Sequence, residues 1–290
     1  MIVRTDKYDL CLTYSWGPNG QGMTGHLFEC IEYYYILKNH FKCCIFIGEE
    51  LSKEFIKNTI IDKYVFSQME IDDIMSNIII SNNPAILKGN NVLITDGNFE
   101  KLKSKHLFFK NILVFPCGNM EFKKRDDIIV FQDNRIYDSK KTNTIHYVKK
   151  ILLNKYKPIG ICEDNNLLYI TNGPREFYNF NELTYMGNYI VLCDSKITLP
   201  DNFITLDMPV KNLMEKFTTY IYTPVQRKFD CSPRFLAECK YYNKNVIFHN
   251  IDYWDIDLGL KWRVYDIEHN FDKLFLKEDD EIINLLKEII

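Results

Sequence analysis

The sequence has few residues of the kinds that mark disordered or disulfide-bonded chains. Of 290 residues only 12 are glycine and 9 are proline, while 46% are hydrophobic. The chain can therefore bury a sizeable core, and its composition is neither disordered nor collagen-like. The nine cysteines include no C-x-x-C pair, which indicates buried thiols in a reducing compartment. We expect a folded cytoplasmic protein, in the host cytoplasm if a phage encodes it.

Targeting segments and an excess of basic charge are also missing. The first nine residues carry charges where a signal peptide needs an apolar run, and nowhere do 18 apolar residues follow one another. We therefore expect no membrane span. The net charge of -3 argues against a protein that holds nucleic acid over its whole surface, although a local basic patch is still allowed.

Several common catalytic motifs are absent. The sequence has no G-x-x-x-x-G-K-[ST] loop, no G-x-S-x-G elbow and no His/Cys cluster with zinc spacing, which disfavours the commonest NTPases and hydrolases. Asp255-Ile-Asp257 could hold a divalent cation against a nucleotide-sugar diphosphate. A solvated acidic turn is the favoured interpretation of these two carboxylates.

What the sequence does contain is the alternation of strands and helices that is typical of parallel sheets. An apolar run at 8–14, a glycine-rich turn at 17–25 and an amphipathic segment at 26–38 predict a strand, a turn and a helix. Further strands are predicted at 43–47, 91–95 and 112–115. Polar or turn residues follow the last two, where an open α/β sheet places its ligand-facing loops.

The pattern stops and then begins again. Residues 121–156 are rich in charge and are interpreted as the passage between domains, after which strands are predicted at 167–170, 189–193, 203–206, 220–224 and 245–249. We expect a first α/β domain at 1–150 and a second α/β domain at 151–275. The apolar spacing at 276–290 predicts a C-terminal helix that packs on a domain or crosses between the two.

The most informative segment surrounds Ser232, Pro233 and Arg234. Pro233 suits the first turn of a helix, whose N-terminus attracts anions, and Arg234 adds a planar donor group that matches phosphate. Glu238, one turn later, could accept hydrogen bonds from sugar hydroxyls, and Asp230 precedes the turn. The spacing thus suits a nucleotide diphosphate, with a solvated surface helix an equally good interpretation.

This segment, "SPRFLAECKYYNKNVI", resembles the donor-binding motif of GT-B glycosyltransferases. Three further segments are similar to the family and follow its order along the chain: "GPNGQGMTGHLFECIEYYYILK", "LLYITNGPREF" and "ITLDMPVKNLMEKFTTYIYTP". The matching segments lie between residues 17 and 247, so the resemblance spans most of the chain. The resemblance implies an α/β fold of two Rossmann-like domains with an interdomain cleft, in which 1–150 would be the acceptor side and 151–275 the donor side. The sequence departs from the family at Asp230, where Glu is usual, and in the turn before Val246, which lacks the usual Gly.

The resemblance also implies roles for individual residues. Glu238 would bind the nucleotide ribose, and Asp230 would face the donor sugar or orient its loop. Ser232, Pro233 and Arg234 would lie near the diphosphate. The loop containing Asn172, Gly173 and Arg175 would face the diphosphate, where Arg175 could neutralise charge on the leaving group; a solvated turn arginine is the alternative. Gly20, Gly22 and Gly25 would let the backbone approach the sugar or acceptor, although an ordinary βα turn is equally consistent.

An inverting transferase also needs a base for the acceptor hydroxyl. Asp96, at the end of a predicted strand, and His26, near the start of the first helix, are the candidates. For each, a structural role is the favoured alternative. A retaining enzyme would need neither residue as a base.

These observations predict a glycosyltransferase that uses a nucleotide sugar, expected to be a UDP-sugar, as co-substrate. No tightly bound cofactor and no metal requirement are expected. The resemblance places a hydroxymethylated pyrimidine in double-stranded phage DNA slightly ahead of a cell-envelope glycan or lipid as acceptor. The basic stretch 123–150 could contact phosphates and the many aromatic residues could stack on a base, although a Lys-rich interdomain surface is the favoured interpretation of this stretch. A non-catalytic binding module on the same scaffold is the alternative from another class.

Overall fold

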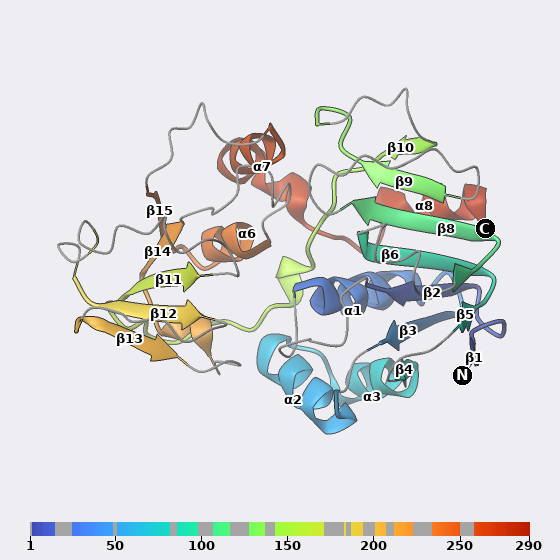
Figure 1. Ribbon diagram of the computed structural model, residues 1–290, viewed down its shortest axis with the longest axis horizontal. Helices are drawn as coiled ribbons and strands as arrows, with labels where there is room; N and C mark the ends of the chain where they lie inside the picture. Colours follow the sequence, from blue (N-terminus) through green and yellow to red (C-terminus); the bar gives the residue numbers. More distant parts are fainter. Residues whose placement is uncertain are drawn as a thin grey trace. The chain divides into compact units, whose positions relative to one another are not determined.

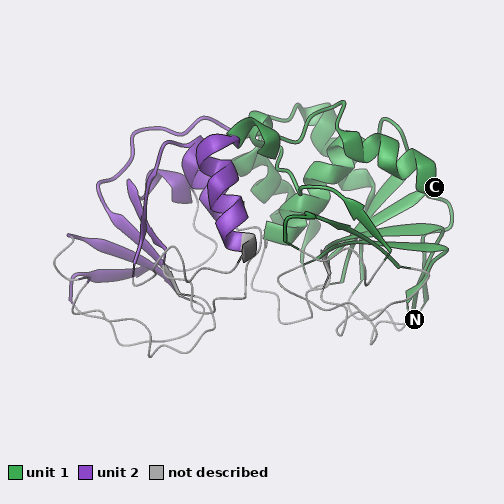
Figure 2. Ribbon diagram, turned by 90° about the horizontal axis from the view of Figure 1, so that it is seen from above, with its two compact units in different colours: residues 1–156, 271–290 green, residues 157–270 purple. Residues whose placement is uncertain are grey.

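A computed structural model describes residues 2–14, 25–48, 51–81, 86–97, 107–116, 128–136, 143–170, 183, 187–193, 201–206, 212–222, 234–249 and 258–290. The chain divides into two compact units (Figure 2). Unit 1 comprises residues 1–156 and 271–290, and unit 2 comprises residues 157–270. Each unit is described by itself.

Unit 1 is built on a seven-stranded parallel sheet with the order β10-β9-β8-β6-β2-β3-β4 (Figure 1). Within this sheet the first strand along the chain, β2, lies between the second, β3, and the fourth, β6. Successive strands are therefore added on one side of β2 and then on the other. The strands are β2 (Leu10–Thr13), β3 (Cys43–Ile47), β4 (Ile78–Ile80), β6 (Asn91–Gly97), β8 (Asn111–Pro116), β9 (Ile128–Gln132) and β10 (Thr144–His146).

Strands β2 and β3 are buried along their whole length and largely apolar, as expected where helices cover both faces of a parallel sheet. Helix α1 (Gly25–Leu37) packs on β2, β3 and β6 and is buried through most of its length, including Glu29 and Glu32. The confirmed part of the fold prediction is an α/β protein with parallel sheets.

Strand β9 corrects the interpretation of residues 121–156 as a passage between domains. Its sequence, Ile-Ile-Val-Phe-Gln, is largely buried and pairs with β8 on one side and β10 on the other. A run of four apolar residues, 128–131, is enough for an inner strand, whatever the charge of the residues around it. This stretch therefore extends the first sheet.

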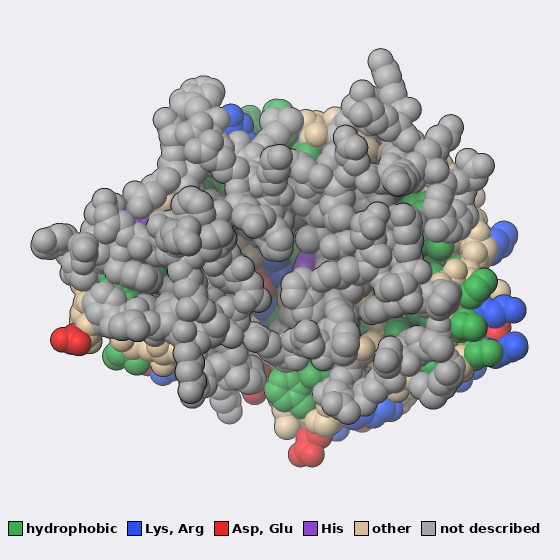
Figure 3. Space-filling model, viewed as in Figure 1, with side chains coloured by type: hydrophobic (Ala, Val, Ile, Leu, Met, Phe, Trp, Pro, Cys, Tyr) green, Lys and Arg blue, Asp and Glu red, His purple; other side chains and the backbone are tan. Residues whose placement is uncertain are grey.

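A second, three-stranded parallel sheet of unit 1 has the order β1-β5-β7. Its strands, β1 (Ile2–Arg4), β5 (Ile86–Lys88) and β7 (Leu107–Phe108), precede β2, β6 and β8 in the chain. Gly89 follows β5, and a Cβ there would lie 2.1 Å from Thr5 Oγ1. The close approach of the chain at this point requires glycine. Exposed apolar side chains of this sheet include Ile2 and Phe108, and Figure 3 shows apolar and basic side chains interleaved on the surface.

Two further helices of unit 1 begin at serine caps. Ser52 caps α2 (Lys53–Lys63), and Ser67 caps α3 (Gln68–Ser76). Ser67 and Glu70 form a capping box, in which each side chain accepts a hydrogen bond from the backbone N–H of the other residue.

The last helix, α8 (Glu281–Ile289), begins at Asp280. Asp280 accepts hydrogen bonds from the backbone N–H of Ile282, from the Tyr147 hydroxyl at 3.1 Å and from the Lys150 ammonium at 2.7 Å. The residues after β10 and the C-terminal helix are thereby held together within unit 1.

Glu32 is a buried carboxylate in the middle of α1. It accepts hydrogen bonds from the hydroxyls of Tyr64 at 2.6 Å and Tyr156 at 3.1 Å, and from the backbone N–H of Leu152 at 3.2 Å. Hydrogen bonds of this kind offset the unfavourable free energy of burying a charge. Glu32 therefore fixes the segment 152–156 to α1.

Unit 2 contains a five-stranded parallel sheet with the order β13-β12-β11-β14-β15. Its first strand, β11, again lies between the second and the fourth. The described helices are α6, which follows β14, and α7 (Figure 1). The elements are β11 (Asn166–Ile170), β12 (Tyr189–Cys193), β13 (Phe203–Leu206), β14 (Thr219–Tyr222), α6 (Arg234–Tyr241), β15 (Asn245–Phe248) and α7 (Leu258–His269).

Short 3-10 helices lie at Leu153–Lys155, Leu213–Glu215 and Phe271–Leu274. Within the described ranges, no helix combines the length and the apolar character needed to cross a bilayer.

Candidate functional site

The topology of unit 1 indicates where a ligand would bind. In open α/β sheets, ligands bind beyond the carboxyl ends of the strands, at the point where the strand order reverses. In unit 1 this point lies between β2 and β6. The residues at and just after the ends of these two strands are therefore the first to consider.

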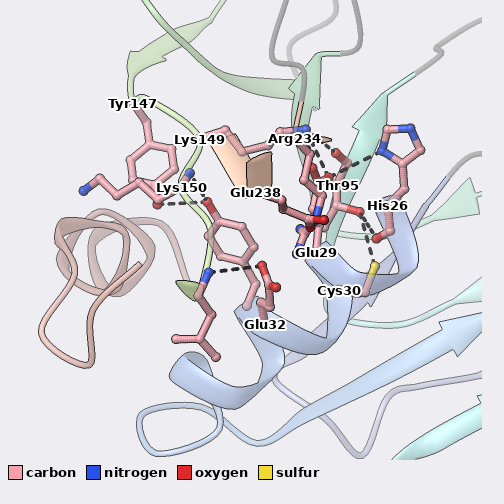
Figure 4. A network of polar contacts seen from close by, with 12 residues as sticks. His26, Glu29, Cys30, Glu32, Thr95, Tyr147, Lys149, Lys150, Arg234 and Glu238 are labelled. Carbon is pink, nitrogen blue, oxygen red and sulfur yellow. Dashed lines mark hydrogen bonds and ion pairs between the residues drawn. The ribbon is translucent and has the colours of Figure 1, made fainter. Parts of the chain in front are cut away.

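A buried threonine, Thr95, connects the elements that meet there (Figure 4). Its Oγ1 lies 3.1 Å from the carbonyl oxygen of His26 in the first turn of α1, and 3.5 Å from the carbonyl oxygen of Thr13 in β2. Cys30 Sγ, one turn further along α1, lies 3.3 Å from the same hydroxyl. Thr95 thus joins the carboxyl end of β6 to the start of α1.

Three charged or titratable side chains extend this network (Figure 4). His26 Nδ1 lies 3.4 Å from Glu29 Oε2, and the ammonium of Lys149 lies 3.0 Å from the Glu29 carboxylate and 3.4 Å from the carbonyl oxygen of Thr95. The Glu29 side chain is 3% exposed and that of Lys149 12%, whereas His26 is 26% exposed. The carboxylate is therefore buried and compensated, while the imidazole reaches solvent.

This arrangement can perform acid–base chemistry. When His26 donates its Nδ1 proton to Glu29, the other ring nitrogen, Nε2, is the basic atom. An imidazole held in this way can remove a proton from a hydroxyl within hydrogen-bonding distance. The partly buried Lys149–Glu29 pair fixes the position of the carboxylate that orients the ring.

Unit 2 contains a second buried charged pair, in α6. The Arg234 Nε donates a 2.8 Å hydrogen bond to Glu238 Oε1 one helical turn later, and the two side chains are 9% and 6% exposed. Helix α6 follows β14, which is the neighbour of β11 at the point where the strand order of this sheet reverses. Neither side chain is solvated, so the alternative of a solvated surface helix is wrong for this pair.

The negative charge of Glu238 affects its neighbours. Burial, and then the Glu238 charge, raise the pKa of the Tyr242 hydroxyl. Burial, and then the same charge, also raise the pKa of the Cys239 thiol, which Lys244 partly opposes. Both groups stay protonated at neutral pH.

The predicted site residues fall into three groups. Arg234, Glu238 and His26 are described, and the structure brings the first two together. Gly25 is the first residue of α1, and Asp96 follows Thr95 in β6, with its backbone alone described. The residues outside the described ranges are Gly20, Gly22, Asn172, Gly173, Arg175, Asp230, Ser232, Pro233, Asp255 and Asp257.

Three cations of the basic stretch 123–150, a candidate for contacts with nucleic-acid phosphates, are paired with carboxylates. Arg135 forms hydrogen bonds with both carboxylate oxygens of Asp133. Lys149 pairs with Glu29 and Lys150 with Asp280. These three cations are compensated by carboxylates of the protein itself, so they do not support phosphate binding.

The sequence interpretation overlooked Glu29, Thr95 and Lys149. Glu29 could have been found, because it lies three residues after His26 and side chains with this spacing meet on a helix surface. Lys149 lies 120 residues from Glu29, and no local pattern connects them.

Among the described residues, no group of three or more His, Cys, Asp or Glu side chains is arranged to hold a metal ion. Comparison with known proteins also gives no assignment: no family model, curated protein or solved structure matches the chain.

Proposed function

We propose that the protein is a glycosyltransferase that moves a sugar from a nucleotide-sugar donor to an acceptor hydroxyl. The Arg234–Glu238 pair, in the helix that follows the reversal point of the unit 2 sheet, carries this proposal. A nucleotide sugar presents a diphosphate and a ribose diol, and the pair offers a group for each.

Unit 2 would bind the donor. Arg234 is in the first turn of α6, where backbone N–H groups and the helix dipole favour an anion, and its guanidinium matches a phosphate. Glu238 would accept hydrogen bonds from the ribose hydroxyls. The two side chains compensate each other, and donor binding would exchange part of this interaction for contacts with diphosphate and ribose.

Unit 1 would bind the acceptor. His26 Nε2 would take the proton as the acceptor oxygen attacks the anomeric carbon and the bond from that carbon to the diphosphate oxygen breaks. Glu29 would stabilise the imidazolium that forms, since its carboxylate lies 3.4 Å from Nδ1. Asp96, at the end of the neighbouring strand β6, is the second candidate base.

An activity measurement tests this proposal. Purified protein is incubated with UDP-glucose and other nucleotide sugars and an acceptor, and release of the nucleotide diphosphate is followed together with sugar incorporation. We expect His26→Asn to reduce kcat by about 10²- to 10⁴-fold, as for loss of a general base, with unchanged donor affinity. An unchanged kcat in this variant and a large loss in Asp96→Asn would transfer the role to Asp96.

Two classes of acceptor belong in this measurement: duplex DNA with hydroxymethylated pyrimidines, and cell-envelope glycans or lipid carriers. Binding to DNA should weaken steeply with salt, and binding to a neutral glycan should not. Donor binding without transfer to any acceptor would favour the non-catalytic binding module.

A further inference from the structure

Unit 2 contains a cysteine and a lysine in direct side-chain contact, away from the Arg234–Glu238 pair. Lys244 Nζ lies 2.9 Å from Cys162 Sγ. Among the described residues, this sulfur also lies 3.8 Å from each of the carbonyl oxygens of Gly160 and Met214. Of these three polar groups, the amine is the closest to the sulfur.

The position of the lysine nitrogen is fixed. Lys244 is 8% exposed, and its ammonium also donates a 2.6 Å hydrogen bond to the carbonyl oxygen of Phe217. Its backbone is held by the turn that ends α6: Asn243 adopts a left-handed conformation with φ of 54°, and Lys244 N–H donates to the carbonyl oxygen of Cys239. The amine cannot move far from the sulfur without breaking these contacts.

The cysteine is held by a different part of unit 2. The Glu163 N–H donates a 2.8 Å hydrogen bond to the carbonyl oxygen of Glu215, and the Gly160 N–H donates to the Glu215 carboxylate at 2.9 Å. Cys162 is partly exposed, unlike the other described cysteines, which are buried. A small oxidant can thus reach this sulfur more easily than the other described thiols.

From this geometry we propose that Cys162 and Lys244 form a reversible oxidative crosslink when the protein meets a peroxide. Hydrogen peroxide oxidises the thiol to a sulfenic acid and is itself reduced to water. The Lys244 amine, after releasing its ammonium proton, attacks the sulfur. A sulfur–nitrogen bond forms, the sulfur–oxygen bond breaks, and the oxygen leaves as a second water molecule. A thiol reductant restores the free cysteine and the free amine.

The crosslink would join the residues before β11 to the end of α6. Cys162 and Lys244 are 82 residues apart in the chain, so a bond between them closes a long loop and restricts the unfolded chain. This modification does not depend on the proposed glycosyltransferase activity.

Peptide mapping of the intact protein tests the crosslink. The full-length folded protein is treated with hydrogen peroxide, digested with trypsin without reduction and analysed by mass spectrometry. We expect a peptide pair that joins Cys162 to Lys244, two hydrogen atoms lighter than the sum of the separate peptides, with loss of tryptic cleavage after Lys244. Dithiothreitol should release both peptides.

Three controls make the test specific. Cys162→Ser and Lys244→Arg should each abolish the pair, whereas Lys240→Arg, a change at an exposed lysine of α6, should leave it intact. Wild-type protein oxidised in denaturant should not form it, because the 2.9 Å contact exists only in the folded state. Oxidation of Cys162 to sulfinic or sulfonic acid in the folded wild type, with normal cleavage at Lys244, would overturn the proposal without any variant.

Discussion

The Thr95 hydroxyl lies 3.1 Å from the carbonyl oxygen of His26, and it thereby joins the end of a central strand to the helix that carries the proposed base. Thr95 is fully buried. The hydrogen bond it makes is therefore formed away from competing water, and its loss leaves a polar carbonyl without that donor.

The Thr95–His26 contact predicts the effect of removing the hydroxyl. Thr95→Val keeps the shape of the side chain and should lower the free energy of unfolding by about 1 to 2 kcal/mol, measured by urea denaturation. Thr95→Ser, which keeps the hydroxyl, should retain more of the sugar-transfer activity than Thr95→Val. Equal activity in the two variants would show that this hydrogen bond does not position His26.

Glu70 predicts a dependence of stability on pH. Burial opposes its ionisation, but hydrogen bonds from the Tyr35 hydroxyl and from Ser67 outweigh it and lower the pKa of Glu70 to about 2. Because the folded pKa lies below the unfolded value, ionised Glu70 stabilises the protein fully above pH 4.5, and this stabilisation disappears as the pH falls towards 2.

Glu70→Gln tests this dependence by urea denaturation at a series of pH values. The variant should be less stable than the wild type by about 1 kcal/mol at neutral pH, a figure reduced for the partial exposure of the side chain. The difference should be constant above pH 4.5 and shrink in more acidic solution. A difference that does not change across this range would contradict the assigned pKa.

Gly89 predicts a steric effect at the small sheet of unit 1. In Gly89→Ala the new Cβ would lie 2.1 Å from Thr5 Oγ1 and 2.8 Å from Phe109 Cε1, which should destabilise the protein by about 1 to 3 kcal/mol. Thr5→Ala removes the closer of the two atoms. The double variant should therefore lose less free energy of unfolding than the two single variants lose together. Losses that add up would argue against this packing.

The parts of the fold that were predictable are those whose apolar residues form complete runs. Strands β2 and β3 are buried at every position, and such runs bounded by polar residues indicate inner strands. Strand β9 was missed because its short apolar run lies in a charged stretch. Its role depends on pairing with β8 and β10, which a local pattern does not contain.

In the candidate site, as in the fold, the local spacing of residues was predictable from the sequence, whereas burial and long-range contacts were not. The spacing of Arg234 and Glu238 places them on one helix face, and the structure pairs them. Their burial, however, is set by the surrounding structure. In unit 1, the spacing of His26 and Glu29 is local, whereas Lys149 reaches Glu29 from a segment after β10. Contacts of that range follow from the topology and not from any motif.

Donor affinity, measured by isothermal titration calorimetry, tests the central claim most directly. UDP and UDP-sugars are titrated into the wild type, into Glu238→Gln and into Lys150→Met, which disrupts a buried ion pair of unit 1 and so controls for general destabilisation. We predict binding to the wild type and to Lys150→Met, and affinity about 10- to 100-fold weaker in Glu238→Gln, as for loss of a charged hydrogen bond. Equal affinity in all three proteins, or no binding of any nucleotide sugar to the wild type, would contradict the account.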